Sequence, residues 1–232
     1  MGWLALRVLA GRGLWAELTE HAGLYLYLLL PTAIVFASFG AVLGSHEERL
    51  SASNRRLSED ALTDPLTTLK NLRYFRARLE EECSISRRDG SAVALLMIDL
   101  DRFKVVNDRY GHPEGDRLLQ AVGRAINSVV RHGETAARVG GEEFALLLPG
   151  GSGDDSAAAS ERVRSAIAAV RVHQPHGAPI GITTSVGHAS TADLGVLDAA
   201  DLYAAADAAL YEAKQQGRDR AIRASSVPTT AG

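Results

Sequence analysis

The sequence lacks several features that would assign the protein to a specialised class. It holds a single cysteine, Cys83, so no disulfide can form within the chain and a reducing compartment is permitted. The 25 Lys and Arg are outnumbered by 28 Asp and Glu, which leaves no basic excess for general nucleic-acid binding. No internal repeat is present. The 232 residues, 46% of them hydrophobic, suffice for one ordinary domain with a real core and an appendage.

One stretch lacks charge altogether. Residues 23–44 contain no charged residue over 22 positions. Because about 20 apolar residues cross a bilayer as a helix, we predict a transmembrane helix here. Pro31 is tolerated in such helices, and Tyr25 and Tyr27 lie near one end, where interfacial aromatic residues are common. A buried core helix and a cleaved export signal are the alternatives.

The segments that flank this stretch predict a membrane-tethered dimer. Residues 1–22 form an amphipathic segment suited to the membrane interface. More arginines follow the span than precede it, which favours a cytoplasmic C-terminal side. Residues 45–63 read as a helical stalk, in which Leu50 and Leu57 are spaced as in a short parallel coiled coil; a solvated single helix fits equally well.

Two short apolar runs, 136–139 and 144–148, are separated by two glycines and two acids. The pattern predicts two antiparallel strands joined by a tight turn, with Gly140 and Gly141 at positive φ. The second run is apolar at successive positions, so we expect it to lie centrally in a sheet. Glu142 and Glu143 stand at the tip of this hairpin without a basic neighbour inside the turn, which favours a cation or a ligand proton as their partner.

The remaining pattern predicts an α+β domain over residues 64–224, with a mostly antiparallel central sheet and helices packed on one face. Residues 225–232 read as a disordered tail. Besides the hairpin, the expected strands are 92–98, 180–186 and 220–223; the expected helices are 71–88, 157–172, 197–216 and one within 113–131; and 150–156 is expected to be a loop.

Three motifs together resemble the GGDEF family of diguanylate cyclases. Residues 140–144 read Gly-Gly-Glu-Glu-Phe, the Glu-containing form of the family signature. Residues 98–108 read Ile-Asp-Leu-Asp-Arg-Phe-Lys-Val-Val-Asn-Asp, and residues 211–218 read Tyr-Glu-Ala-Lys-Gln-Gln-Gly-Arg. All three match the family in order and spacing. The resemblance implies a fold like that of nucleotidyl cyclase and polymerase palm domains, and condensation of two GTP molecules to cyclic di-GMP with release of two pyrophosphates.

The resemblance also implies a metal site for Mg²⁺ or Mn²⁺. Its ligands would be Asp99, the carbonyl of Leu100, and Glu142, an all-oxygen set that suits a hard cation. Asp99 follows the predicted strand 92–98, so we expect it at the strand exit beside the hairpin tip; a simple strand-end acid is the alternative. Glu142 is our choice of general base, with Glu143 or water as alternatives.

The matching positions for GTP follow residue by residue. Asn107 and Asp116 occupy the guanine-reading positions, with His112 lining the same pocket. The alternatives are that Asn107 caps the end of a helix and that Asp116 is a charge near a helix N-terminus. The glycines Gly140 and Gly141 form the turn at the substrate. Cations for the triphosphate would be Lys104, Lys214 and Arg218. The last two share a helix face unless Gly217 ends the helix.

A product-inhibition site is implied just before the signature. The family pattern Arg-x-x-Asp is represented by Arg131 and Glu134, with Arg162 as a second arginine; a surface Arg–Glu pair is the alternative.

Near the start of the domain, Thr68 replaces the usual glycine and Leu72 an arginine. The activity so implied needs a homodimer. A bacterial inner-membrane protein with a cytoplasmic cyclase domain is expected; a catalytically silent nucleotide-binding module or a cyclase of different product is the alternative.

Overall fold

The computed structural model describes residues 62–174, 177–195 and 198–225, together with residues 22–24, 27, 29, 36 and 39. The chain divides into two compact units, Met1–Asp60 and Ala61–Gly232. Among the described residues, no helix is both long enough and apolar enough to cross a membrane. The predicted N-terminal segment, most of the predicted span and stalk, and nearly all of the predicted tail lie outside the described residues, so these remain predictions.

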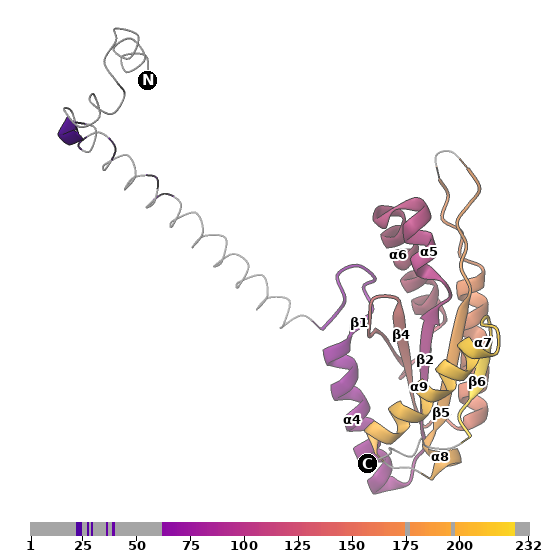
Figure 1. The fold of residues 1–232 in the computed structure, drawn as a ribbon. Helices are drawn as coiled ribbons and strands as arrows, with labels where there is room; N and C mark the ends of the chain where they lie inside the picture. Colours follow the sequence, from indigo (N-terminus) through magenta and orange to yellow (C-terminus); the bar gives the residue numbers. More distant parts are fainter. Residues whose placement is uncertain are drawn as a thin grey trace. The chain divides into compact units, whose positions relative to one another are not determined.

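The second unit is built on a six-stranded sheet in the order β1-β3-β4-β2-β5-β6 (Figure 1). The strands are β1 (Lys70–Asn71), β2 (Val93–Leu100), β3 (Thr135–Arg138), β4 (Glu143–Pro149), β5 (Thr184–Ser190) and β6 (Ala221–Arg223). The three inner pairings are antiparallel, and the two edge strands β1 and β6 pair in parallel. The predicted hairpin, the central place of its second strand and the edge strand near the C-terminus are therefore confirmed.

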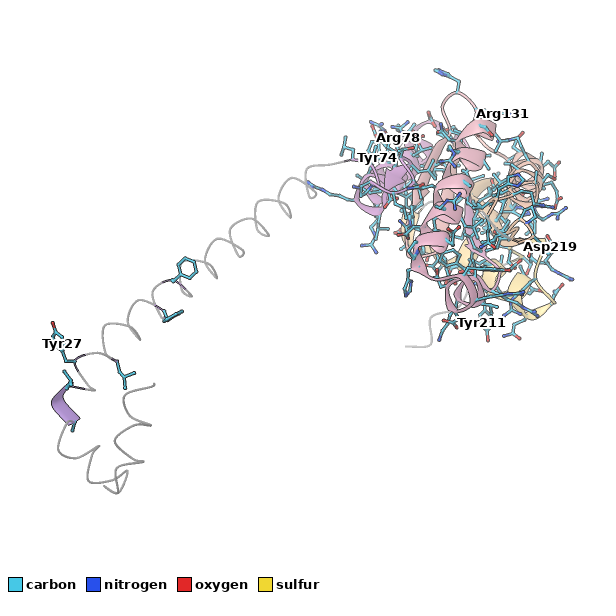
Figure 2. The ribbon with its side chains drawn as sticks, turned by 90° about the horizontal axis from the view of Figure 1, so that it is seen from above. Tyr27, Tyr74, Arg78, Arg131, Tyr211 and Asp219 are labelled. Atoms are coloured by element: carbon cyan, nitrogen blue, oxygen red, sulfur yellow. The ribbon has the colours of Figure 1, made fainter. Side chains whose placement is uncertain are left out.

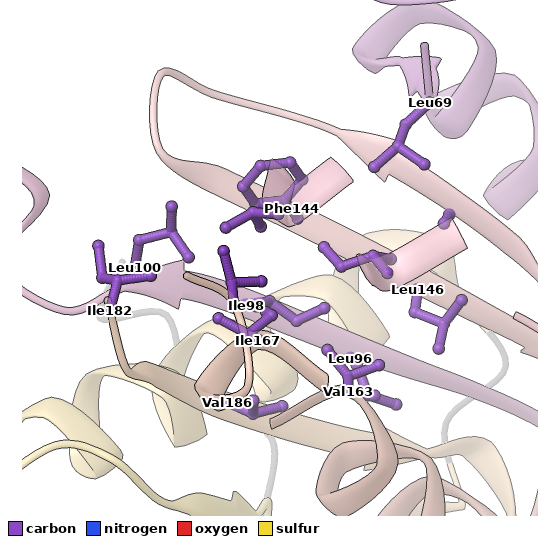
Figure 3. Close-up of a cluster of buried hydrophobic side chains, with 14 of the residues drawn as sticks. Leu69, Leu96, Ile98, Leu100, Phe144, Leu146, Val163, Ile167, Ile182 and Val186 are labelled. Carbon is purple, nitrogen blue, oxygen red and sulfur yellow. The ribbon is translucent and has the colours of Figure 1, made fainter. Parts of the chain in front are cut away.

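Helices cover both faces of this sheet, which corrects the prediction of one covered face. They are α4 (Leu72–Asp89), α5 (Phe103–Tyr110), α6 (His112–Val129), α7 (Gly153–Ala168), α8 (Thr191–Leu194) and α9 (Ala199–Gln215). Leu96 and Ile98 of β2 pack in one apolar cluster with α6 and α7 (Figure 3), whereas Leu95 and Met97 pack in another with α4 and α9. Side chains alternate across a strand, so a strand that is apolar at every position needs a cover on each face.

Two elements, β5 and α7, are each displaced by four residues from their predicted ranges. The strand expected at 180–186 is β5, four residues further along, and Ile180 makes only an isolated bridge with Val172. The strand continues through polar side chains because these are hydrogen-bonded inside the protein; His188, for example, lies 2.8 Å from the Ser156 hydroxyl. Helix α7 starts within the expected loop, since Ser152 and Asp155 form a capping box.

Candidate active site

The acidic centre lies where β2 meets the tip of the β3–β4 hairpin. Asp99 is the seventh residue of β2 and pairs with Glu143 on one side and Ser185 on the other. Asp99 therefore lies inside the strand, and the prediction that it stands at the strand exit is wrong. The Leu100 amide donates to the Glu142 carbonyl over 3.2 Å. This backbone bond brings Asp99, Leu100 and Glu142 together from segments more than forty residues apart in the sequence.

The pKa values of both carboxylates are displaced upward. Burial raises the pKa of Asp99, and the neighbouring ammonium of Lys214 offsets part of this rise. Burial also raises the pKa of Glu142, and the charges of Asp99 and Glu143 raise it further. A buried acid beside further negative charge is stabilised in its ionised form by a cation, so this centre favours cation binding.

Within the protein itself, without any bound ligand, Lys214 supplies a positive charge to this centre. Its ammonium lies 2.8 Å from a carboxylate oxygen of Asp99, and both side chains are largely withdrawn from solvent. The two carboxylates and the neighbouring carbonyl are hard oxygen donors, which suit a small divalent cation. The residues present therefore fit such an ion, with Lys214 as the charge that balances Asp99 without it.

The turn itself differs from the one predicted. Neither Gly140 nor Gly141 is among the described glycines with positive φ. At position 140 a Cβ would approach the carboxylate of Glu143, so a larger residue would require this side chain to shift. At Gly141 a Cβ would meet nothing within 4 Å. The turn is closed by the Val139 amide, which donates to the Glu143 carbonyl over 2.9 Å.

Arg138 links the turn to the start of the domain, a contact that the sequence analysis did not foresee. Its guanidinium donates to the Gly141 carbonyl over 2.7 Å and lies 3.3 Å from both carboxylate oxygens of Asp64. Asp64 also accepts from the amide and the hydroxyl of Thr67. The hairpin tip that holds Glu142 is thus tied to the turn through which the chain enters the domain.

The predicted guanine-reading residues lie on two helices that pack against each other. Helix α5, which was not predicted, carries Asn107; a Cβ on Gly115 of α6 would collide with the Asn107 carboxamide. Asp116 follows directly and is exposed, as is His112 at the first position of α6. The end of α5 is capped by backbone, since the Gly111 amide donates to the Asn107 carbonyl. The Asn107 side chain is therefore placed against α6.

The three predicted phosphate-binding cations come from different elements. Lys104 is exposed in the first turn of α5, and Lys214 lies in the last turn of α9. Arg218 follows Gly217 outside the helix and has a φ of 65°, so the shared helix face is wrong and the alternative of a helix end is confirmed. The Arg218 charge nevertheless lowers the pKa of Asp99, so this cation acts on the acidic centre.

The predicted product-site residues meet in a different pattern from the one expected. Arg162 of α7 donates through Nη2 to both carboxylate oxygens of Glu134, each over 2.8 Å. Glu134 also accepts from the backbone amide of Arg131 over 2.7 Å. The Arg131 side chain lies on the domain surface (Figure 2), beside a hollow of about 230 Å³ that Glu134 and Asp155 also line.

The sheet, its two helical layers and the carboxylates at the hairpin define an α+β domain with an acidic centre at one end of a central strand. Residues 61–220 match the family described as diguanylate cyclase, GGDEF domain. The chain belongs to this family. Its members generally need divalent metal ions, in agreement with the oxygen donors found here.

Named relatives and solved structures agree with this assignment. Diguanylate cyclase DgcP of Pseudomonas aeruginosa is 40% identical over 181 residues, which cover 77% of this chain and 26% of that protein. The GGDEF domain of DgcB from Caulobacter crescentus, solved with c-di-GMP, has a TM-score of 0.67 and 34% identity and covers 71% of this chain and 96% of that one. Diguanylate cyclase SiaD of Pseudomonas aeruginosa, solved with its activator SiaC, matches with a TM-score of 0.67 and 33% identity. The match covers 95% of this chain and 83% of the SiaD chain. The chain spans between 24% and 46% of the length of three curated relatives that it matches.

Proposed function

We propose that the protein is an active diguanylate cyclase, which condenses two GTP molecules to cyclic di-GMP and releases two pyrophosphates. The observation that carries the proposal is the meeting of Asp99 and Glu142, joined by the backbone bond from Leu100 to Glu142. This arrangement supports metal-assisted nucleotidyl transfer because it concentrates negative charge where a triphosphate and its cation would bind.

The substrate would be held from two sides. Asn107 and Asp116 would read the guanine edge between α5 and α6, with His112 lining the same pocket; a carboxylate accepts from the guanine N–H groups and an amide serves a mixed edge. Lys104, Lys214 and Arg218 would bind the triphosphate, and the turn at Gly140 and Gly141 would border it. The ammonium of Lys214, 2.8 Å from Asp99, and the charge of Arg218, which lowers the pKa of Asp99, support this division for two of the three cations.

The residues that would hold the metal are Asp99, the Leu100 carbonyl and Glu142. We propose Mg²⁺, or Mn²⁺ in its place, because the donors are hard oxygens and the substrate brings phosphate oxygens of the same kind. When bound, the ion would supply positive charge for the phosphates and for the developing charge of the reaction.

The reaction joins a 3′-hydroxyl oxygen of one GTP to the α-phosphorus of the other. The bond between that phosphorus and the oxygen bridging to the β-phosphate breaks, and pyrophosphate leaves with the bonding electrons. The hydroxyl proton goes to a carboxylate, for which we choose Glu142 because it stands at the hairpin tip next to Asp99, where the α-phosphate and its cation would bind. Glu143, the next residue, or a water molecule is the alternative acceptor.

Each domain would hold one GTP, so both bonds of the product require two domains that face each other across a two-fold axis. We propose a homodimer for this reason. Residues 45–63 would form its helical stalk, and residues 23–44 would anchor it in the bacterial inner membrane with residues 64–224 in the cytoplasm. The proposal for the anchor rests on the uncharged stretch of 22 residues.

Product feedback is proposed at Arg131, Glu134 and Arg162. The hollow beside Arg131 and the planar fork of Arg162 support binding of a guanine edge or a phosphate. The competing role is structural, since the Arg162–Glu134 pair alone would fasten the start of β3 to α7.

Two other functions compete with the active cyclase. One is a silent module that binds nucleotide and passes signals through its dimer; the complete signature and the gathered carboxylates favour activity. The other is a cyclase that makes a mixed purine dinucleotide. Purified full-length protein, incubated with labelled GTP and Mg²⁺ with and without ATP, separates the three. We expect cyclic di-GMP alone; no dinucleotide product refutes activity, and a mixed product with ATP refutes GTP specificity.

A further inference from the structure

Asp101 is a buried carboxylate that the proposed chemistry does not use. It stands two residues after Asp99, directly beyond β2, and only 8% of it is exposed. Within the described part of the chain, no Lys or Arg forms an ion pair with it. Its partners are three uncharged donors: the Thr183 hydroxyl at 2.8 Å, the Ser185 hydroxyl at 2.7 Å and the Asp219 amide at 3.0 Å. A buried carboxylate held in this way has a structural reason to be there.

The bond from Asp219 differs from the other two in what it connects. Ser185 belongs to β5, which already pairs with β2 through the sheet, and Thr183 directly precedes that strand. Asp219 belongs to the loop between α9 and β6, far along the chain. The Asp101 oxygen that receives the Asp219 amide therefore ties this loop to the end of β2 that bears the acidic centre.

The loop needs such a tie because its backbone is strained. Gly217, Arg218 and Asp219 all have positive φ, of 113°, 65° and 46°. A left-handed conformation is unfavourable for a residue with a side chain, and two such residues, Arg218 and Asp219, stand here in succession. The loop is held from outside by a second contact, between the Asp219 carboxylate and Arg164 of α7 at 3.0 Å, on the domain surface (Figure 2). From inside, Asp101 holds the peptide that joins Arg218 to Asp219.

We propose that Asp101 is a positioning residue for Arg218: it accepts the amide directly after Arg218 and so holds this guanidinium on the phosphate side of the acidic centre. The inference rests on the proposed function, since it takes Arg218 as a ligand of the triphosphate. It assigns Asp101 a geometric role, as an acceptor, and neither a metal-binding nor a proton-transfer role.

Two conservative substitutions separate geometry from charge. In Asp101→Asn, the amide oxygen can take the place of the oxygen that receives Asp219 and Thr183, and the amide nitrogen can donate to the Ser185 oxygen, so the loop stays tied although the charge is lost. In Asp101→Glu the charge remains, but the added methylene moves the oxygens by about 1.5 Å and the bond to Asp219 is broken. Ser185→Ala is the matched control, because it removes one bond to the same carboxylate and leaves the loop alone.

The test measures binding by calorimetry to the full-length protein, with 3′-deoxy-GTP as a triphosphate that lacks the attacking hydroxyl and guanosine as a ligand without phosphate. We expect Asp101→Glu to weaken the binding of 3′-deoxy-GTP about fivefold, which is close to the loss of one hydrogen bond. The binding of guanosine should be unchanged. Asp101→Asn and Ser185→Ala should stay within about twofold of wild type. Asp101→Glu should have no further effect when Arg218→Ala is already present.

Four results would overturn the inference. Asp101→Asn could weaken the binding of 3′-deoxy-GTP as much as Asp101→Glu does, or Asp101→Glu could weaken the binding of guanosine equally. The effects of Asp101→Glu and Arg218→Ala could add, or the wild-type protein could fail to bind 3′-deoxy-GTP. If Asp101→Glu does not fold, Asp101→Ser replaces it, since its hydroxyl is too short to reach Asp219. A wild-type chain that makes no cyclic di-GMP but shows the expected binding pattern refutes the proposed cyclase activity and leaves this inference standing.

Discussion

The threonine at position 68 provides a test of the turn through which the chain enters the domain. Thr68 is exposed and has a φ of 61°, in the left-handed region that β-branched residues avoid. The turn is otherwise well closed: the Thr68 amide donates to the Asp64 carbonyl over 2.9 Å, and the Asp64 amide to the Leu69 carbonyl over 2.8 Å. Thr68→Gly should therefore relieve strain without removing a backbone bond.

The expected gain follows from opposing contributions to the free energy of unfolding. A non-glycine residue held in the left-handed region costs about 1–3 kcal/mol, of which we take about 2 for threonine. Glycine gives back about 0.5–1 kcal/mol through the greater freedom of the unfolded chain. The Thr68 hydroxyl donates to the adjacent carbonyl of Thr67, but water can replace it at this exposed position. About 1 kcal/mol of stabilisation remains, or a rise in Tm of about 2–4 °C for a domain of this size.

Thermal unfolding of the full-length protein, followed by circular dichroism, would measure this shift. Thr63→Gly is the matched control: Thr63 is an exposed threonine of the same segment but is not among the residues with positive φ, so glycine there should lower Tm. If both substitutions lower Tm by the same amount, Thr68 carries no conformational strain and the reasoning fails. GTP turnover should be unchanged in both variants.

Four further predictions concern the site. Glu142→Gln should abolish cyclic di-GMP formation while 3′-deoxy-GTP still binds; near-wild-type turnover at matched Mg²⁺ would contradict the role of Glu142. Asp116→Ala should weaken GTP binding by roughly 1–3 kcal/mol in calorimetry, the size of one good base contact. Lys214→Gln should tighten the binding of Mn²⁺ to the nucleotide-free protein about tenfold, because the ammonium competes with the ion for Asp99. The same substitution should weaken the binding of 3′-deoxy-GTP. Paramagnetic resonance of free Mn²⁺ would measure the first effect. Cyclic di-GMP should weakly inhibit the initial rate of the wild-type protein. Inhibition should be stronger after Glu134→Asp, because the shorter side chain would release Arg162, and should be lost after Arg131→Ala. Unchanged inhibition in both variants would exclude the feedback site.

The parts of the fold that the sequence predicted well are those written as local apolar patterns. The hairpin of β3 and β4 is an example, because two apolar runs flank a glycine-rich turn. Helix α5 was missed because its eight residues, among them Val105 and Val106, are too few to show a helical period. The end of β5 was missed because its buried polar residues resemble a loop until their partners are known, as with Ser190, whose hydroxyl donates to the Gly151 carbonyl.

The site shows the same division between local and distant information. Motif spacing predicted that Asp99 and Glu142 would meet, and the structure brings them together. The contacts of Asp101 could not be predicted, since Thr183 and Asp219 lie 82 and 118 residues further along the chain. No periodicity records a pairing of that kind. The predicted positive φ at Gly140 is wrong for a related reason, because this glycine lies against the side chain of Glu143 and does not take a left-handed backbone conformation.

The acidic centre explains why substrate and cation would bind together. Burial and neighbouring negative charges raise the pKa values of Asp99 and Glu142, so their ionised forms are less stable here than in water. Lys214 balances part of this charge, but a single ammonium at Asp99 leaves Glu142 without an equally close cation among the described residues. A divalent ion would neutralise both carboxylates and would release Lys214 for a phosphate. A triphosphate would in turn contribute oxygens to the ion and accept the released ammonium. Each ligand thus removes a cost that opposes the other, and the two should bind with positive coupling.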